Sequence, residues 1–217
     1  MASHSNTGAA RFLPVKRDLT ELRHAAAGCR GCDLYRNATQ TVFGKGPPGA
    51  RFLLVGEQPG DQEDLRGEPF VGPAGRVLDR ALAEAGIDRE AVYVTNAVKH
   101  FKFEQLKSGQ RGKRRIHRKP SVGEIMACRP WLEAEIDAVD PDVVVVLGAT
   151  AARAVLGPGF QVTRRRGEPV ECGEGRLAVA TIHPSAILRA DDREAAYAGF
   201  LADLEAAARA APPARAR

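Results

Sequence analysis

The sequence predicts a three-layer α/β/α sandwich with a mostly parallel central sheet. Short apolar runs typical of buried strands alternate along the chain with longer amphipathic segments typical of helices. The clearest run, at 142–147, is mostly aliphatic, as expected for a parallel strand that is covered on both faces. Hydrophobic residues make up 44% of the 217 residues, which is enough for the core that such a domain requires.

The first half of the chain predicts two helices and two strands. Asp18 is a typical cap for a helix over 18–27, because an acidic residue follows it three positions later. An apolar run predicts the first strand at 51–55, and an acidic loop follows it. Apolar residues on one face predict a helix over 74–85, and a second apolar run predicts a strand at 91–96.

The second half predicts three helices and three β segments. Ser121 and Glu124 form a capping box at the start of a helix over 121–139, and Pro130 inside it predicts a kink or a break. The remaining elements are the strand at 142–147, a short helix at 149–156, a shorter β section at 162–170, the last central strand at 176–182 and a helix at 193–210.

A single domain over residues 11–210 is the simplest organisation, with residues 1–10 disordered and a basic C-terminal tail at 211–217. The net charge of +5 favours an anionic partner. The sequence contains no run of eighteen apolar residues, so we expect no membrane span, and its N-terminus lacks the apolar core of a secretion signal. We therefore expect a cytoplasmic protein, and we also expect a monomer.

A long segment without apolar periodicity follows the second strand, from about residue 99 to residue 121. Connections of this length are usually functional or disordered, and we expect a loop that is not rigid. Six of the nine residues from Arg111 to Lys119 are basic, and His117 lies among them. This charge favours contact with a polyanion. The function of the protein then depends on the role of His117 within this basic segment.

Polar clusters lie at the carboxyl ends of three expected strands. Gly56-Glu57-Gln58 follows the first strand, Asn96 ends the second, and His183-Pro184-Ser185 follows the last. In open parallel sheets, ligands bind beyond the carboxyl ends of the strands. We therefore expect the three clusters to converge on one site.

Five motifs, in order along the chain, resemble those of the uracil-DNA glycosylase superfamily. They are Gly56-Glu57-Gln58-Pro59-Gly60, Glu63-Asp64, the run from Gly67-Glu68-Pro69-Phe70 to Gly75, Asn96, and His183-Pro184-Ser185. Within the superfamily the chain is similar to the iron–sulfur branch, family 4. Gln58 and the Lys-Arg-Arg-Ile-His segment at 113–117 are similar to the branch called UdgX. The resemblance covers residues 18–208 and implies the fold predicted above.

The resemblance implies an enzyme that breaks the bond between uracil N1 and the sugar C1′. Such an enzyme flips the nucleotide out of the stack and stabilises the charges that develop on base and sugar. By motif, Phe70 would stack on uracil, Asn96 would read its hydrogen-bonding edge, and His183 would bond uracil O2. The other residues that would bind the substrate are Gly56, Gln58 and Ser185.

UdgX proteins capture the sugar C1′ covalently, and the resemblance implies that His117 is the trapping nucleophile. Glu57 would hydrogen-bond one nitrogen of His117 and leave the other unprotonated, while Gln58 would help to hold the loop closed. Two alternatives stay open. One is a multiple-turnover family 4 glycosylase whose loop only binds DNA, and the other is a non-catalytic iron–sulfur module that binds single-stranded or uracil-containing DNA.

The basic residues of the long segment would neutralise DNA phosphates and draw the strand in. These residues are Lys113, Arg114, Arg115, Arg118 and Lys119. A second run, Arg164-Arg165-Arg166, either extends this surface or forms a solvated face. The expected partner is uracil-containing DNA, with single strands preferred because they avoid the cost of unpairing.

Cys29 and Cys32 have the spacing of a metal site that needs two more ligands, and this spacing fits zinc as well as iron–sulfur. The resemblance implies a [4Fe–4S] cluster with Cys128 as a further ligand. His100 stands where the family's third cysteine is expected, which implies three cysteines and one histidine. Cys172 is the rival fourth ligand. The cluster would have a structural role at the base of the long segment.

Overall fold

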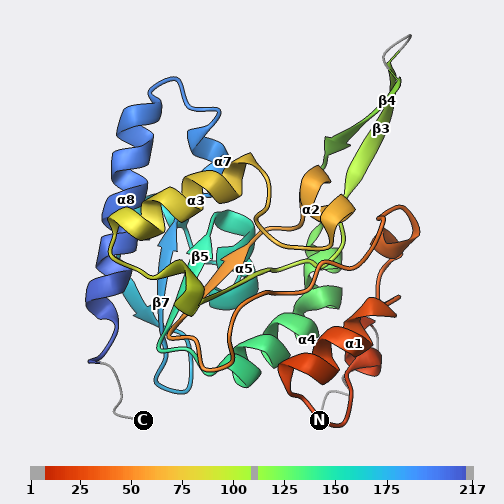
Figure 1. Ribbon diagram of the computed structural model, residues 1–217, viewed down its shortest axis with the longest axis horizontal. Coiled ribbons are helices and arrows are strands. Elements are labelled where there is room, and N and C mark those ends of the chain that lie inside the picture. Colours follow the sequence, from red (N-terminus) through yellow and green to blue (C-terminus); the bar gives the residue numbers. More distant parts are fainter. Residues whose placement is uncertain (1–7, 109–111, 214–217) are drawn as a thin grey trace.

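The structure is a computed structural model that describes residues 8–108 and 112–213, and it has the expected three layers (Figure 1). Five strands form the central sheet in the order β2-β1-β5-β7-β6, and only β6 runs antiparallel to its neighbour. The strands are β1 (Phe52–Gly56), β2 (Val92–Asn96), β5 (Val143–Leu147), β6 (Pro169–Glu171) and β7 (Leu177–Thr181). The predicted fold class is confirmed.

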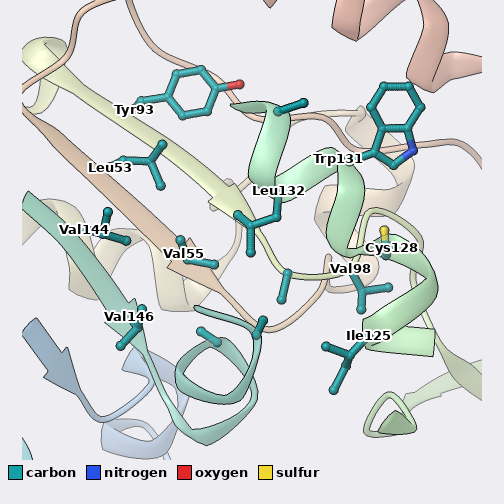
Figure 2. Close-up of a cluster of buried hydrophobic side chains, with 14 of the residues drawn as sticks. Leu53, Val55, Tyr93, Val98, Ile125, Cys128, Trp131, Leu132, Val144 and Val146 are labelled. Atoms are coloured by element: carbon teal, nitrogen blue, oxygen red, sulfur yellow. The ribbon is translucent and has the colours of Figure 1, made fainter. Parts of the chain in front are cut away.

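Helices cover both faces of this sheet. One face carries α1 (Leu19–Ala27), α4 (Val122–Val139) and α5 (Ala149–Leu156), and the other carries α3 (Pro73–Glu84), α7 (Pro184–Ile187) and α8 (Arg193–Ala210). Leu53, Val55, Val144 and Val146 belong to the core on the face that α4 and α5 cover (Figure 2). Because successive strand residues point to opposite faces, the residues between them build the second core against α3 and α8.

The predicted caps form as expected, but the predicted break in the long central helix does not. The Asp18 side chain accepts hydrogen bonds at the N-terminus of α1, and Ser121 and Glu124 form the capping box of α4. α4 continues as one helix through Pro130. The next two residues of α4 are almost fully buried: Leu132 faces the sheet, and Trp131 lies on the opposite side of the helix, where its indole N–H meets Cys29 (Figure 2). This packing outweighs the lost backbone hydrogen bond.

The long basic segment is a β-hairpin rather than an irregular loop. β3 (Phe103–Ser108) and β4 (Gly112–His117) pair antiparallel, with Phe103 opposite His117 at the base, and the hairpin projects beyond the sheet (Figure 1). A hairpin that projects from the body buries little of either face, so its sequence needs no apolar period. The basic composition therefore concealed the two strands.

Three smaller segments also differ from expectation. The acidic loop after β1 is a helix, α2 (Asp61–Arg66), and the β section expected at 162–170 divides into α6 (Val162–Arg165) and β6. Residues Gly8–Phe12 form a 3₁₀ helix, η1, with Ala9 buried, where we expected disorder up to residue 10. Expectations for residues 1–7 and 214–217 fall outside the described residues.

The remaining short elements are the 3₁₀ helices η2 (Asp33–Arg36) and η3 (Arg89–Ala91). No helix within the described ranges is long and apolar enough to cross a membrane.

Candidate active site

A cavity of about 560 Å³ opens where β1, β2, β5 and β7 end, so the three polar clusters do converge. It lies at the carboxyl edge of the parallel strands, as expected for this type of sheet. The expected site residues that line it are Glu57, Gln58, Phe70, Asn96, His117, Lys119, His183 and Ser185.

Phe70 and Asn96 meet over the end of β1. A Cβ atom on Gly56 would lie 2.3 Å from Asn96 Oδ1 and 2.8 Å from Phe70 Cζ, so glycine leaves the space that both side chains need. Phe70 is 8% exposed and has a φ of 58°, a strained conformation of the kind found at functional sites. Its ring lies 6.3 Å from that of His183, with 25° between the planes. This arrangement suits a flat polar ring.

His183 is held in a neutral form with a defined tautomer. The Ser185 N–H donates to His183 Nδ1 over 3.1 Å, and the Ser185 hydroxyl lies 2.8 Å from the same nitrogen. Burial, together with the charge of Arg189 and that of His117 when it is protonated, lowers the pKa of His183 to about 4. Because Nδ1 accepts a hydrogen bond, we assign the ring proton to Nε2. The ring therefore offers one N–H donor to a ligand.

His117, the last residue of β4, brings its ring to this cavity from the hairpin. Gln58 Nε2 lies 2.9 Å from His117 Nε2, and it also donates to the carbonyl oxygens of Lys102 and Arg118 at 3.2 and 2.9 Å. Gln58 Oε1 accepts the Lys102 N–H over 2.9 Å. Gln58 thus joins both ends of the hairpin to β1. Because the amide nitrogen is a donor, His117 Nε2 carries a lone pair in this arrangement.

Glu57 does not make the expected hydrogen bond to His117. Its Oε1 lies 3.6 Å from His117 Nε2, the nitrogen that Gln58 already approaches, and its Oε2 accepts a hydrogen bond from Thr150 Oγ1. Glu57 therefore acts on the ring through its charge. Burial lowers the pKa of His117, the Glu57 carboxylate opposes that effect, and Arg189 reinforces it. The net effect is a pKa of His117 below its ordinary value, which favours the neutral imidazole.

Two residues that line the cavity, Thr150 and Arg189, were not among the predicted site residues. Thr150 lies in the first turn of α5, directly beyond the end of β5. Arg189 follows α7, four residues after Ser185. The position of Thr150 just past the end of β5 was a usable signal, but Arg189 lies beyond α7, and the direction of its side chain was not readable from the sequence.

The sequence matches the uracil DNA glycosylase superfamily over residues 43–205. This chain belongs to the uracil-DNA glycosylase superfamily. It is 40% identical to the type-4 uracil-DNA glycosylase of Thermotoga maritima over 162 residues, and this matched region covers 74% of this chain and 78% of the relative. It is 34% identical over 177 residues to that of Archaeoglobus fulgidus, covering 78% and 83%. The similarity to family 4 is confirmed, and the UdgX resemblance stays a prediction.

Arg115, which was expected to contact DNA phosphates, is paired with carboxylates of the protein itself. Its side chain is 16% exposed and forms ion pairs with Asp61 and Asp64, while its guanidinium lies over the rings of Phe101 and Phe103. These contacts fix the hairpin against α2. Because two carboxylates already pair with this guanidinium, these contacts favour a structural role for Arg115.

The other basic residues of the hairpin are not equivalent to one another. Arg118 pairs with Glu104 on the neighbouring strand, whereas Arg114 is exposed. Lys119 is exposed and lines the cavity. Lys113 lies in β4, but its side chain is outside the described part of the structure.

Two of the three arginines in the second basic run pair with carboxylates of the protein. Arg165 pairs with Glu168 at 3.0 Å, and Arg166 pairs with the largely buried Asp203 at 2.7 Å. These pairs favour a structural role for Arg165 and Arg166, whereas Arg164 is exposed, so both interpretations of this run stay open for that residue.

The expected metal ligands are not assembled into a closed metal site. No group of three or more His, Cys, Asp or Glu side chains in the described residues is arranged to hold a metal ion. Cys29 and Cys128 are nonetheless buried, and the thiols of Cys29 and Cys32 lie near enough to Cys128 to act on its charge. Cys172 instead lies beside Arg176 in the turn between β6 and β7.

The donor set at these cysteines fits an iron–sulfur cluster. Trp131 Nε1–H donates to Cys29 Sγ over 3.2 Å, and the Lys99 N–H donates to Cys128 Sγ over 3.3 Å; cluster sulfurs accept such bonds. His100 is buried, with Nε2 2.9 Å from Thr41 Oγ1. If Thr41 accepts that proton, Nδ1 is free to bind metal. A [4Fe–4S] cluster binds each ligand at a different iron, so its ligands need not converge on one point.

Proposed function

We propose that this protein is a uracil-DNA glycosylase that excises uracil and then bonds covalently to the sugar C1′ through His117. The observation that carries the proposal is the position of His117 Nε2. This nitrogen faces the donor amide of Gln58, so it carries a lone pair, and the ring shares one cavity with Phe70, Asn96 and His183. Burial lowers the pKa of His117, which favours the neutral ring. The names of the type-4 relatives support the excision of uracil.

Each part of the proposed reaction has a residue in this cavity. Phe70 and Asn96 hold the flipped base, and His183 Nε2–H bonds uracil O2 as the N1–C1′ bond breaks and its electron pair leaves with uracil. The Glu57 carboxylate offsets the positive charge that develops on the sugar. The lone pair of His117 Nε2 then forms the new bond to C1′, and Glu57, 3.6 Å away, offsets the resulting imidazolium charge.

A multiple-turnover glycosylase is the second candidate, because the similarity to type-4 enzymes extends over most of the chain. In that reaction a water molecule attacks C1′ in place of His117, and the hairpin serves to close the site. The two reactions differ in the fate of the sugar.

One experiment separates these functions. The protein is incubated with a uracil-containing single-stranded oligonucleotide, denatured with heat and detergent, and run on a gel. We expect a slow-migrating adduct with the wild type and with His24→Ala, an exposed histidine on α1, and none with His117→Ala. An adduct in His117→Ala would exclude the proposed nucleophile. Repeated release of uracil without an adduct would establish turnover, and no release at all would indicate a binding module.

The proposal includes a cofactor and a preferred substrate. Cys29, Cys32, His100 and Cys128 would hold a [4Fe–4S] cluster, which would cross-link the N-terminal segment, the base of the hairpin and α4. A protein of this type would act as a monomer on single-stranded DNA, which presents the base without unpairing.

A further inference from the structure

We infer that Arg189 and Lys119 form a phosphate clamp that holds the DNA backbone beside the nucleotide to be excised. This inference rests on the proposed function and adds a positioning pair to it. The ligand is the phosphodiester of the substrate strand itself. Lys119 was already expected to contact phosphate. Arg189 is the new member of the pair and takes the place of Arg115, which pairs with Asp61 and Asp64.

The first argument is the free charge of these two side chains. Both are exposed and both line the cavity. Within the described ranges, neither side chain has an ion pair or a hydrogen bond, whereas Arg115 and Arg118 are each paired with carboxylates. An unpaired cation keeps its full charge for an incoming anion and loses no internal partner when it binds.

The second argument is location. Lys119 follows the hairpin and Arg189 follows α7, yet both reach the same cavity as His117. The charge of Arg189 also acts on the rings of both His117 and His183, so it lies near the reacting centre. Attack on C1′ requires that sugar to lie against His117, and its own phosphates then lie at the mouth of the cavity. Contacts to phosphates set the register of a strand.

The test uses the full-length protein and an oligonucleotide whose target uridine carries a 2′-fluoro group, which resists cleavage. Affinity is measured across a series of salt concentrations for the wild type, Arg189→Gln and Lys119→Gln. The control is Arg209→Gln, which removes an equal charge near the C-terminal end of α8. The uncleaved probe reports binding whether or not the protein excises uracil, so failure of the clamp and failure of the proposed function are distinguishable.

Each clamp variant is expected to lower affinity about tenfold and to reduce the slope of log affinity against log salt by about 0.7, the value for one single-strand phosphate contact. Arg209→Gln is expected to leave the slope unchanged. With a cleavable substrate at saturation, Arg189→Gln is expected to slow the reaction, and Arg189→Lys to restore part of it. Clamp variants with the slope and affinity of the wild type would overturn the inference. A loss of affinity and slope in Arg209→Gln as large as that in the clamp variants would overturn it as well.

Discussion

Gln58→Glu is the substitution that most directly tests how the hairpin presents His117. Gln58 is 6% exposed, and its side chain connects β1 to both ends of the hairpin and to the ring of His117. A glutamate of nearly the same shape can still accept the Lys102 N–H. It cannot donate to the two carbonyl oxygens or to His117 Nε2.

The size of the effect follows from these contacts. The amide has two hydrogens for three acceptors, so Gln58→Glu removes two hydrogen bonds, each contributing about 1 kcal/mol. A loss of about 2 kcal/mol reduces the ratio of closed to open hairpin about 30-fold. The new carboxylate also favours the protonated ring, which raises the pKa of His117.

The assay is the single-turnover rate of adduct formation from pH 5 to pH 8. We expect Gln58→Glu to slow the reaction by up to about 30-fold and to move its acid limb to higher pH. Gln40→Glu is the matched control, because Gln40 Nε2 also donates to two carbonyl oxygens, at 3.0 and 3.1 Å, without contacting His117. A Gln58→Glu profile identical to that of the wild type would refute the reasoning, and so would an equal loss in Gln40→Glu.

Three further predictions concern acid–base behaviour and the cluster. In Glu57→Gln the pKa of His117 falls further, because the carboxylate that raises it is gone. The rate of adduct formation should drop, and the acid limb of its pH profile should move to lower pH. An unchanged profile would contradict the role of Glu57. The pKa of His183 is about 4 in the folded protein against an ordinary 6.5, so the folded state binds fewer protons between these values. The contribution of His183 to the free energy of unfolding, measured with urea, should therefore fall by about 3 kcal/mol from pH 7 to pH 4. The pH dependence of unfolding in His183→Asn should lack this contribution. Purified protein should be brown, and the colour should be lost in His100→Ala and kept in Cys172→Ser; a colourless, zinc-loaded protein would contradict the cluster.

The fold and the place of the site were predictable because their signals are local. A continuous aliphatic run such as 143–147 is typical of a parallel strand that is buried on both faces, and this requirement constrained the layers on either side. Caps such as Asp18 and Ser121 mark helix starts through bonds within four residues. Polar residues just after strands then indicated one shared edge, where Glu57, Asn96 and His183 do meet.

The hairpin was missed because its stability does not come from an apolar face. Arg115 looked like a DNA contact in the sequence, since nothing local shows that Asp61 and Asp64, more than fifty residues earlier, lie beneath it. Likewise, only the fold shows that Glu57 is held by Thr150 and that Gln58 is the residue at hydrogen-bonding distance from His117.

By itself, the sequence determined which residue types stand at the strand ends, and therefore which chemistry is available to this protein. Tertiary structure decided which of them touch and which charges remain unpaired. The reason is physical: strand and helix patterns depend on neighbours a few residues away, whereas ion pairing depends on distances between segments that the chain brings together only on folding. Arg115 and Arg189 carry the same charge, but only Arg189 stays free at the cavity.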